Sequence, residues 1–216
     1  MTDTDRTRWE TRYTDGTMPV HASGNRWLAD QTAFLDTVTA ASASPPHALD
    51  IACGNGGTLV WLAQRGWRVT GVDISTTALA QARTRLGAAG LLDRATLIEA
   101  DLDTWRPAER YDLVTCFFFL DRRLWPSLRT VVRPDGLICL STFHTGRLVD
   151  YPETNPAHLL TPGELTTLIK GWKWGLLAAQ TDVQLEAVFA QCTVDHVARD
   201  ANPNTARSPY ASPRPR

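Results

Sequence analysis

A glycine-rich segment between two apolar runs carries the groups that could do chemistry. Residues 48–58 read ALDIACGNGGT and residues 69–73 read VTGVD. This pattern predicts a buried strand, a glycine turn, a helix and a second strand that ends at the carboxylate of Asp73. Because this is half of a nucleotide-binding βαβ unit, we expect an adenosine-bearing ligand at the turn.

The residues around the turn distinguish between adenosine ligands. A dinucleotide site has the spacing G-x-G-x-x-G, but Leu59 stands at the third glycine position. Asp50 precedes the turn, and its charge would repel a pyrophosphate at the N-terminus of the next helix. S-adenosylmethionine fits better, because it offers an ammonium group, a sulfonium group and ribose hydroxyls, the last for Asp73.

These residues resemble the first two motifs of class I S-adenosylmethionine-dependent methyltransferases. The motif D-x-A-x-G-x-G at residues 50–56 has Ala52 where the family usually has glycine. Three later segments follow in the family's order. Residues 95–102 resemble its third strand and the acid after it, residues 111–116 resemble its fourth strand, and residues 128–142 resemble its next helix, turn and fifth strand. The resemblance runs from about Ala48 to Phe143 and implies S-adenosylmethionine as the cofactor.

The resemblance also implies a set of cofactor-binding residues. Asp101 would meet the adenine amino group and Leu102 its ring, although Asp101 could instead form a turn after the strand. Asp73 would bind the ribose, although it could instead cap the next helix, as Ser75 and Thr76 also could. The whole set comprises Asp50, Ala52, Gly54, Gly56, Asp73, Ile74, Asp101, Leu102 and Phe117.

A second resemblance concerns the substrate. Residues 8–13, RWETRY, are similar to the W-x-x-R-Y opening of small-molecule methyltransferases related to the tellurite-resistance and thiopurine methyltransferases. Residues 119–123 and 159–165 suggest the same kinship. It implies that residues 1–42 form a helical cap over the cofactor and substrate, although Trp9 could equally be a packing residue. The expected substrate residues are Trp9, Tyr13, Phe118, Phe119 and Arg122.

No general base is assigned by the sequence. His144, after the expected fifth strand, could act as a base near neutral pH or be an ordinary loop histidine. Asp121 is the other candidate. The sulfonium is intrinsically activated, so the protein mainly needs to supply proximity, orientation and a dry pocket. Residues 116–121 lack the Asn/Asp-Pro-Pro-aromatic motif of enzymes that methylate exocyclic amines, which disfavours DNA or glutamine N-methylation.

Alternating strands and helices predict an α/β fold with a doubly wound parallel sheet and helices on both faces. The resemblance implies a Rossmann-like, mostly parallel seven-stranded sheet with a C-terminal antiparallel strand. We expect a methyltransferase domain over residues 43–198 and a disordered tail over residues 199–216. The expected strands are 48–52, 67–73, 95–100, 111–117, 136–143, 172–179 and 185–194, and the expected helices are 25–41, 57–65, 76–87, 122–132 and one from Thr161.

The composition of the chain limits which kinds of partner molecule are expected. The net charge of −1 over 216 residues argues against a general polyanion binder, so no nucleic-acid partner is expected. The four cysteines form no C-x-x-C pair, so we expect no metal site. No apolar run reaches 18 residues and no signal-peptide pattern opens the sequence, so we expect a cytoplasmic protein without a membrane partner.

The sequence therefore predicts a methyltransferase that passes the methyl group of S-adenosylmethionine to an O, N or S atom of a small molecule. One alternative is a non-catalytic protein that binds the same cofactor, because a cofactor motif does not establish chemistry. A less favoured one is an NAD-dependent oxidoreductase, which Leu59 and Asp50 oppose. Methylation of RNA or protein is disfavoured by the neutral charge. The acceptor and the oligomeric state stay open.

Overall fold

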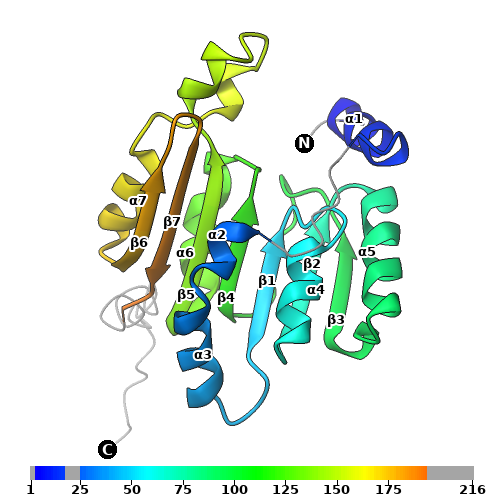
Figure 1. Ribbon diagram of the computed structural model, residues 1–216, viewed down its shortest axis with the longest axis vertical. Coiled ribbons are helices and arrows are strands. Elements are labelled where there is room, and N and C mark those ends of the chain that lie inside the picture. The colour runs from blue at the N-terminus through cyan, green and yellow to red at the C-terminus, as the bar shows by residue number, and fades with distance from the viewer. Residues whose placement is uncertain (1–2, 18–24, 194–216) are drawn as a thin grey trace, which may run out of the picture.

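Seven strands form one sheet, in the order β3-β2-β1-β4-β5-β7-β6, in the computed structural model (Figure 1). The structure describes residues 3–17 and 25–193. β7 runs antiparallel to both β5 and β6, and the other neighbouring pairs are parallel. The expected mostly parallel sheet with a C-terminal antiparallel strand is confirmed. Its strands are β1 (His47–Ile51), β2 (Arg68–Asp73), β3 (Ala95–Glu99), β4 (Tyr111–Phe117), β5 (Val132–Phe143), β6 (Gly175–Thr181) and β7 (Leu185–Gln191).

Helices lie against both faces of this sheet. One buried apolar cluster joins the sheet to α2, α3, α4 and α5, and a second joins it to α6 and α7. The α-helices are α1 (Asp3–Thr14), α2 (Arg26–Ala29), α3 (Thr32–Ala41), α4 (Gly57–Gln64), α5 (Thr76–Ala88), α6 (Trp125–Val131) and α7 (Glu164–Trp172). Short 3-10 turns are η1 (Leu92–Arg94), η2 (Arg122–Leu124), η3 (Thr145–Val149) and η4 (Pro156–His158).

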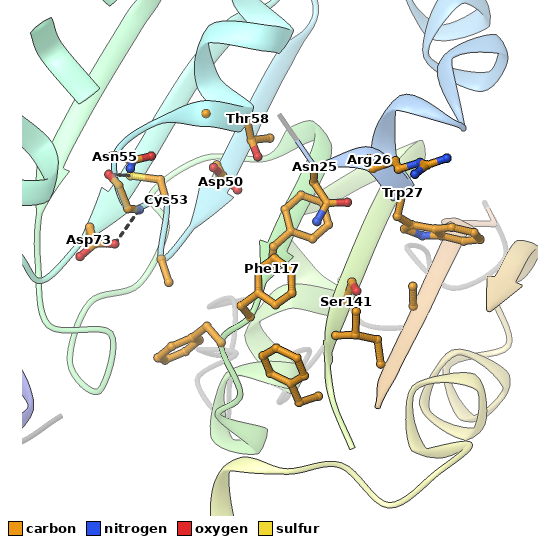
Figure 2. Close-up of a pocket in the computed structure, with 18 of the residues that line it drawn as sticks. Asn25, Arg26, Trp27, Asp50, Cys53, Asn55, Thr58, Asp73, Phe117 and Ser141 are labelled. Carbon is orange, nitrogen blue, oxygen red and sulfur yellow. Dashed lines mark hydrogen bonds between the residues drawn. The ribbon is translucent and has the colours of Figure 1, made fainter. Parts of the chain in front are cut away.

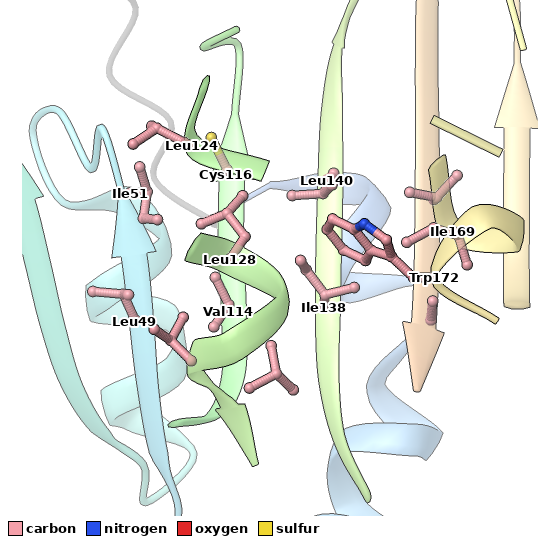
Figure 3. Close-up of a cluster of buried hydrophobic side chains, with 14 of the residues drawn as sticks. Leu49, Ile51, Val114, Cys116, Leu124, Leu128, Ile138, Leu140, Ile169 and Trp172 are labelled. Carbon is pink, nitrogen blue, oxygen red and sulfur yellow. The ribbon is translucent and has the colours of Figure 1, made fainter. Parts of the chain in front are cut away.

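The alternation of side chains along each strand decides which layer they join. Leu49 and Ile51 of β1 pack in the α6 and α7 cluster, together with Val114 of β4 and Ile138 of β5 (Figure 3). Ala48 packs in the other cluster, with α4. Successive strand residues point to opposite faces, so Asp50 shares the α4 face with Ala48.

A small residue on β2 lets α4 approach the sheet. A Cβ at Gly71 would lie 2.5 Å from Cδ1 of Leu59 and 2.8 Å from Sγ of Cys53. In a dinucleotide fold the third glycine of the motif, on the helix, supplies this room. Here the large residue, Leu59, is on the helix and the glycine is on the strand.

Several element boundaries differ from the expected ones. The helix expected over residues 25–41 is interrupted at Gln31, which has φ −99° and ψ 15°, so α2 and α3 are separate. The strand expected from Trp172 begins at Gly175, because α7 continues to Trp172 and ends at Lys173 with φ 59°. α7 begins at Glu164 and not at Thr161, although the Glu164 carboxylate does accept a hydrogen bond from the Thr161 amide at 2.8 Å.

Two further expectations concern the C-terminal tail and membrane-spanning helices. The tail predicted at residues 199–216 lies outside the described residues. Within residues 3–17 and 25–193, no helix has the length and apolar character needed to cross a membrane.

Replacing Gly71 by alanine should destabilise the protein, because the added methyl group overlaps Leu59 and Cys53. Overpacking of this kind costs about 1–3 kcal/mol in free energy of unfolding. Urea denaturation measures the change. Gly171→Ala in α7 is the matched control, since a Cβ there meets nothing within 4 Å and alanine favours a helix. Equal stability of the two variants would contradict the packing described for β2.

Candidate ligand-binding site

A cavity of about 960 Å³ lies at the carboxyl ends of the central strands. It is lined by Asp73 and Phe117, the last residues of β2 and β4, and by Asp50, the last residue but one of β1. Ligands of open α/β sheets bind at this edge of the sheet. A single small-molecule pocket measures roughly 300–1,000 Å³, so this cavity lies near the upper limit of that range.

Most of the predicted site residues line this cavity. The structure brings together Trp9, Tyr13, Asp50, Ala52, Gly54, Asp73, Ile74, Leu102, Phe117, Phe118 and Phe119. Figure 2 shows Asp50, Cys53 and Asp73 on one side and Asn25, Trp27 and Ser141 on the other. The cavity therefore has a carboxylate-rich half at β1 and β2 and a second half at β4, β5 and β7.

The turn after β1 has a left-handed backbone at alternate residues. φ is 54° at Ala52, 52° at Gly54 and 78° at Gly56. A residue with a Cβ costs roughly 1–2 kcal/mol in this region, which explains the glycines and makes Ala52 a strained position. Gly54 also has no room for a Cβ, because the Tyr13 hydroxyl occupies that space. Backbone strain of this kind concentrates at functional sites.

The Asp73 carboxylate joins this turn to the end of β2. One oxygen accepts a hydrogen bond from the Gly54 amide at 2.8 Å, and the other accepts one from the Ser75 amide at 2.9 Å. Ser75, and not Asp73, caps α5, because its hydroxyl accepts from the Ala78 amide at 3.0 Å. Burial raises the pKa of Asp73, and the two amide bonds oppose that effect.

Asp50 is a buried carboxyl group with one partner. Oδ1 accepts a hydrogen bond from the Thr115 hydroxyl at 2.6 Å, and no described residue donates to Oδ2. Burial raises the pKa of Asp50 to about 7, with a further contribution from the charge of Asp73. The free oxygen is on a residue that lines the cavity, so this half of the site favours a cationic group.

The register of β5 and β7 forms the floor of the second half. Ser141 is paired with Ala187 and Phe143 with Leu185, so these four side chains share one face. Phe117 and Phe118 adjoin the floor, and Phe118 has a strained φ of 56°. Most of this half was not predicted from the sequence, and neither was the contribution of α2 and the residues that flank it. The lining residues concerned are Asn25, Arg26, Trp27, Asp30, Ser141, Arg147, Gln180, Asp182, Leu185 and Ala187.

α1 lies over the carboxylate-rich half and is held there by polar contacts. The Glu10 carboxylate accepts hydrogen bonds from the amides of Thr76 and Thr77, at the N-terminus of α5. The Arg6 guanidinium donates to the Ile74 carbonyl at 2.9 Å. Tyr13 is consequently buried beside Gly54, although it lies on a short polar helix.

Five predicted residues do not line the cavity. Gly56 caps α4 and packs against Ala82. The Asp101 carboxylate accepts from the Asp103 amide, as in the alternative interpretation of a turn residue. Arg122 pairs with Glu164 at 2.5 Å, and Asp121 pairs with Arg123 at 2.8 Å.

His144 has a structural environment as well. Its Nδ1 accepts a hydrogen bond from the Gly146 amide at 2.9 Å, so the ring nitrogen opposite, Nε2, donates to the Asp182 carbonyl at 2.9 Å. Both ring nitrogens are engaged with the backbone, and His144 is 5% exposed. A role as a base stays a prediction that this hydrogen bonding does not favour.

Comparison with known proteins agrees with this geometry. Residues 48–136 match the family described as "Methyltransferase domain". The sequence is 33% identical over 97 residues to thiocyanate methyltransferase 1 of Arabidopsis thaliana, and the match covers 42% of this chain and 43% of that protein. The chain spans about half the length of the curated relatives it matches.

Solved structures share the fold. Magnesium protoporphyrin IX methyltransferase from Synechocystis PCC 6803 with bound S-adenosylmethionine aligns with a TM-score of 0.63 and 14% identity, over 88% of this chain and 96% of that chain. TehB from Haemophilus influenzae aligns with a TM-score of 0.60 and 16% identity, over 75% of this chain and 62% of that one. The Rossmann-like fold expected from the sequence is the fold of these proteins.

The contribution of Asp50 to the stability of the ligand-free protein should fall as pH rises from about 4 to about 7. The pKa of Asp50 is raised from 3.8 to about 7, so in this range the folded protein keeps a proton that the unfolded chain has lost. Asp50→Asn should flatten this dependence and be relatively more stable at pH 8 than at pH 5. Denaturant titration at both pH values measures it, with the exposed Asp36→Asn as the control for lost charge. An unchanged dependence in Asp50→Asn would contradict the assignment.

Proposed function

We propose that this protein, whose residues 48–136 match the family described as "Methyltransferase domain", transfers a methyl group from S-adenosylmethionine to a small-molecule acceptor. One observation carries the proposal. The strained glycine turn, the unpaired oxygen of Asp50 and the carboxylate of Asp73 converge on one half of a cavity that continues over β5 and β7. The shared fold and the 33% identical relative support the same conclusion.

The residues of the carboxylate-rich half fit this cofactor. The free oxygen of Asp50 suits an ammonium group, and Asp73 retains lone pairs that can accept from ribose hydroxyls. The Asp50 carboxylate beside the turn opposes a pyrophosphate, so the geometry disfavours NAD.

The chemistry supplied by bound S-adenosylmethionine is an electrophilic methyl group on a sulfonium. The chain's part is to hold the acceptor in line with that group and to exclude water. Phe117 stands between the two halves of the cavity (Figure 2), and Phe117 and Phe118 both supply apolar surface to its lining. Among the described lining residues, Tyr13 and Cys53 have pKa values raised by burial, so they stay protonated at neutral pH and provide no base.

α1 and α2 are proposed to be the cap over this site, as part of residues 1–42. α1 contributes Trp9 and Tyr13 to the carboxylate-rich half, whereas α2 and its N-cap residue contribute Trp27 and Asn25 to the other half. The cap would close the cavity over both ligands. The acceptor is proposed to be small, in keeping with the name of the thiocyanate methyltransferase relative.

Calorimetry should detect binding of S-adenosylmethionine and S-adenosylhomocysteine, but not of NAD. Asp73→Asn should weaken the binding of both adenosyl compounds about 10-fold or more, since it replaces a charged acceptor of ribose hydrogen bonds. The thermal midpoint of each variant shows whether the turn is intact. Binding of NAD alone would overturn the proposal, and binding without turnover on a broad acceptor panel would indicate a non-catalytic protein.

The pH dependence of cofactor affinity tests the role of Asp50. The ammonium pairs with the ionised carboxylate, whose pKa is about 7, so affinity should rise about 10-fold between pH 6 and pH 8. In Asp50→Asn the rise should disappear. If affinity still rises with pH in this variant, a group other than Asp50 is responsible, and the role of Asp50 is contradicted.

Glu10→Gln tests the cap. The amide cannot keep the charge-assisted bonds to the Thr76 and Thr77 amides, so α1 should dock less firmly. We expect cofactor affinity to fall about 3- to 10-fold while the unfolding free energy of the sheet stays nearly unchanged. Thr11→Ser on the exposed side of α1 is the control. Unaltered affinity in Glu10→Gln would show that α1 does not cover the site.

A further inference from the structure

Arg147 is a cation that lines the second half of the cavity. It belongs to η3, which follows β5. In the sheet, β5 is three strands away from β2, the strand that ends at Asp73. None of the motifs found in the sequence includes it. Its surroundings indicate an anion-binding role.

Two aromatic rings hold the guanidinium group. Its central carbon lies 3.9 Å from the ring centre of Phe143 and 4.1 Å from that of Tyr151. Phe143 is also part of the cavity floor. Stacking on the faces of the group leaves its N–H donors, which point outward in the plane, available to a ligand.

The charge of Arg147 is unpaired within the described part of the chain. Its one side-chain hydrogen bond goes to the neutral Gln184 Oε1 at 3.3 Å, and no described carboxylate lies within ion-pair distance. Arg122 and Arg133, by contrast, pair with Glu164 and Asp112. A half-buried, immobilised and unpaired arginine at a cavity wall suits an anionic ligand.

The carboxylates near Arg147 are held by other donors. Oδ1 of Asp182 accepts from the amides of Gln184 and Leu185, at 2.8 and 2.7 Å. Asp150 accepts a hydrogen bond from the side-chain amide of Gln184. These bonds fix both acids in place, away from ion pairing with Arg147.

The backbone that carries Arg147 is fixed as well. His144 accepts from the Gly146 amide and donates to the Asp182 carbonyl, which ties η3 to the turn between β6 and β7. A Cβ at Gly146 would overlap the Val183 carbonyl and the His144 ring. His144 is therefore a positioning residue for the arginine that follows it.

We propose that Arg147 binds a carboxylate group of the methyl acceptor, whose apolar body lies on Leu185 and Ala187. The planar guanidinium matches a carboxylate in two parallel hydrogen bonds, and the floor offers apolar contact beside it. This inference rests on the proposed methyltransferase function. It names the substrate class as small aromatic or apolar carboxylic acids.

Binding to the complex with S-adenosylhomocysteine tests the inference. The probes are benzoate, 4-hydroxybenzoate and indole-3-carboxylate, each compared with its carboxamide by calorimetry. In the wild type at least one carboxylate should bind about 10- to 100-fold more tightly than its amide. Arg147→Met should abolish this preference, with unchanged affinity for S-adenosylhomocysteine as evidence of a folded site. Arg147→Lys, which lacks the planar fork, should keep only part of it.

Arg65→Met is the matched control. Arg65 is also stacked on an aromatic ring, with its central carbon 3.6 Å from the ring centre of Trp61, but it does not line the cavity. The carboxylate preference should survive there. Equal affinity of acids and amides in the wild type, no detectable binding of any acid, or a preference that survives in Arg147→Met overturns the inference. Failure of S-adenosylhomocysteine to bind overturns the proposed function instead, and the acid and amide pairs are then compared on the protein alone.

Discussion

The bond between the Asp73 carboxylate and the Gly54 amide is the contact on which the site depends. It connects the turn after β1 to the end of β2, so two neighbouring strands present their last residues as one surface. Left-handed φ values at Ala52, Gly54 and Gly56 are tolerated because this carboxylate and the packing of α4 hold the turn. The same carboxylate lines the cavity, so one side chain both builds the site and is available to a ligand.

The sequence predicted best what depends on neighbouring residues. The spacing of Asp50, Gly54, Gly56 and Asp73 follows from a strand, a tight turn and a returning strand, which are local constraints. The order of the apolar runs predicted a parallel sheet with a layer of helices on each face, because parallel strands with intervening helices have few alternative arrangements. Boundaries were predicted less well, as at Gln31 and Trp172, where single backbone conformations decide whether a helix stops.

The second half of the cavity could not be predicted from local pattern. Its floor exists because Ser141 meets Ala187 and Phe143 meets Leu185, pairings between residues more than 40 positions apart. Arg122 was an expected substrate residue, but in the structure its charge is paired with Glu164. His144 precedes η3 and is hydrogen-bonded to the turn between β6 and β7, whereas Arg147 within η3 stacks on Phe143 and Tyr151. Neither environment follows from the local sequence.

The exchange of a small and a large residue between α4 and β2 has a consequence for how such sites diverge. Leu59 fills the space above Gly71, whereas a dinucleotide fold keeps its small residue on the helix. Restoring a glycine at position 59 alone would leave a void, and enlarging residue 71 alone would produce a steric clash. Conversion between the two kinds of cofactor site therefore needs changes at both positions together. Either single change gives a less stable protein, although the two folds are almost the same.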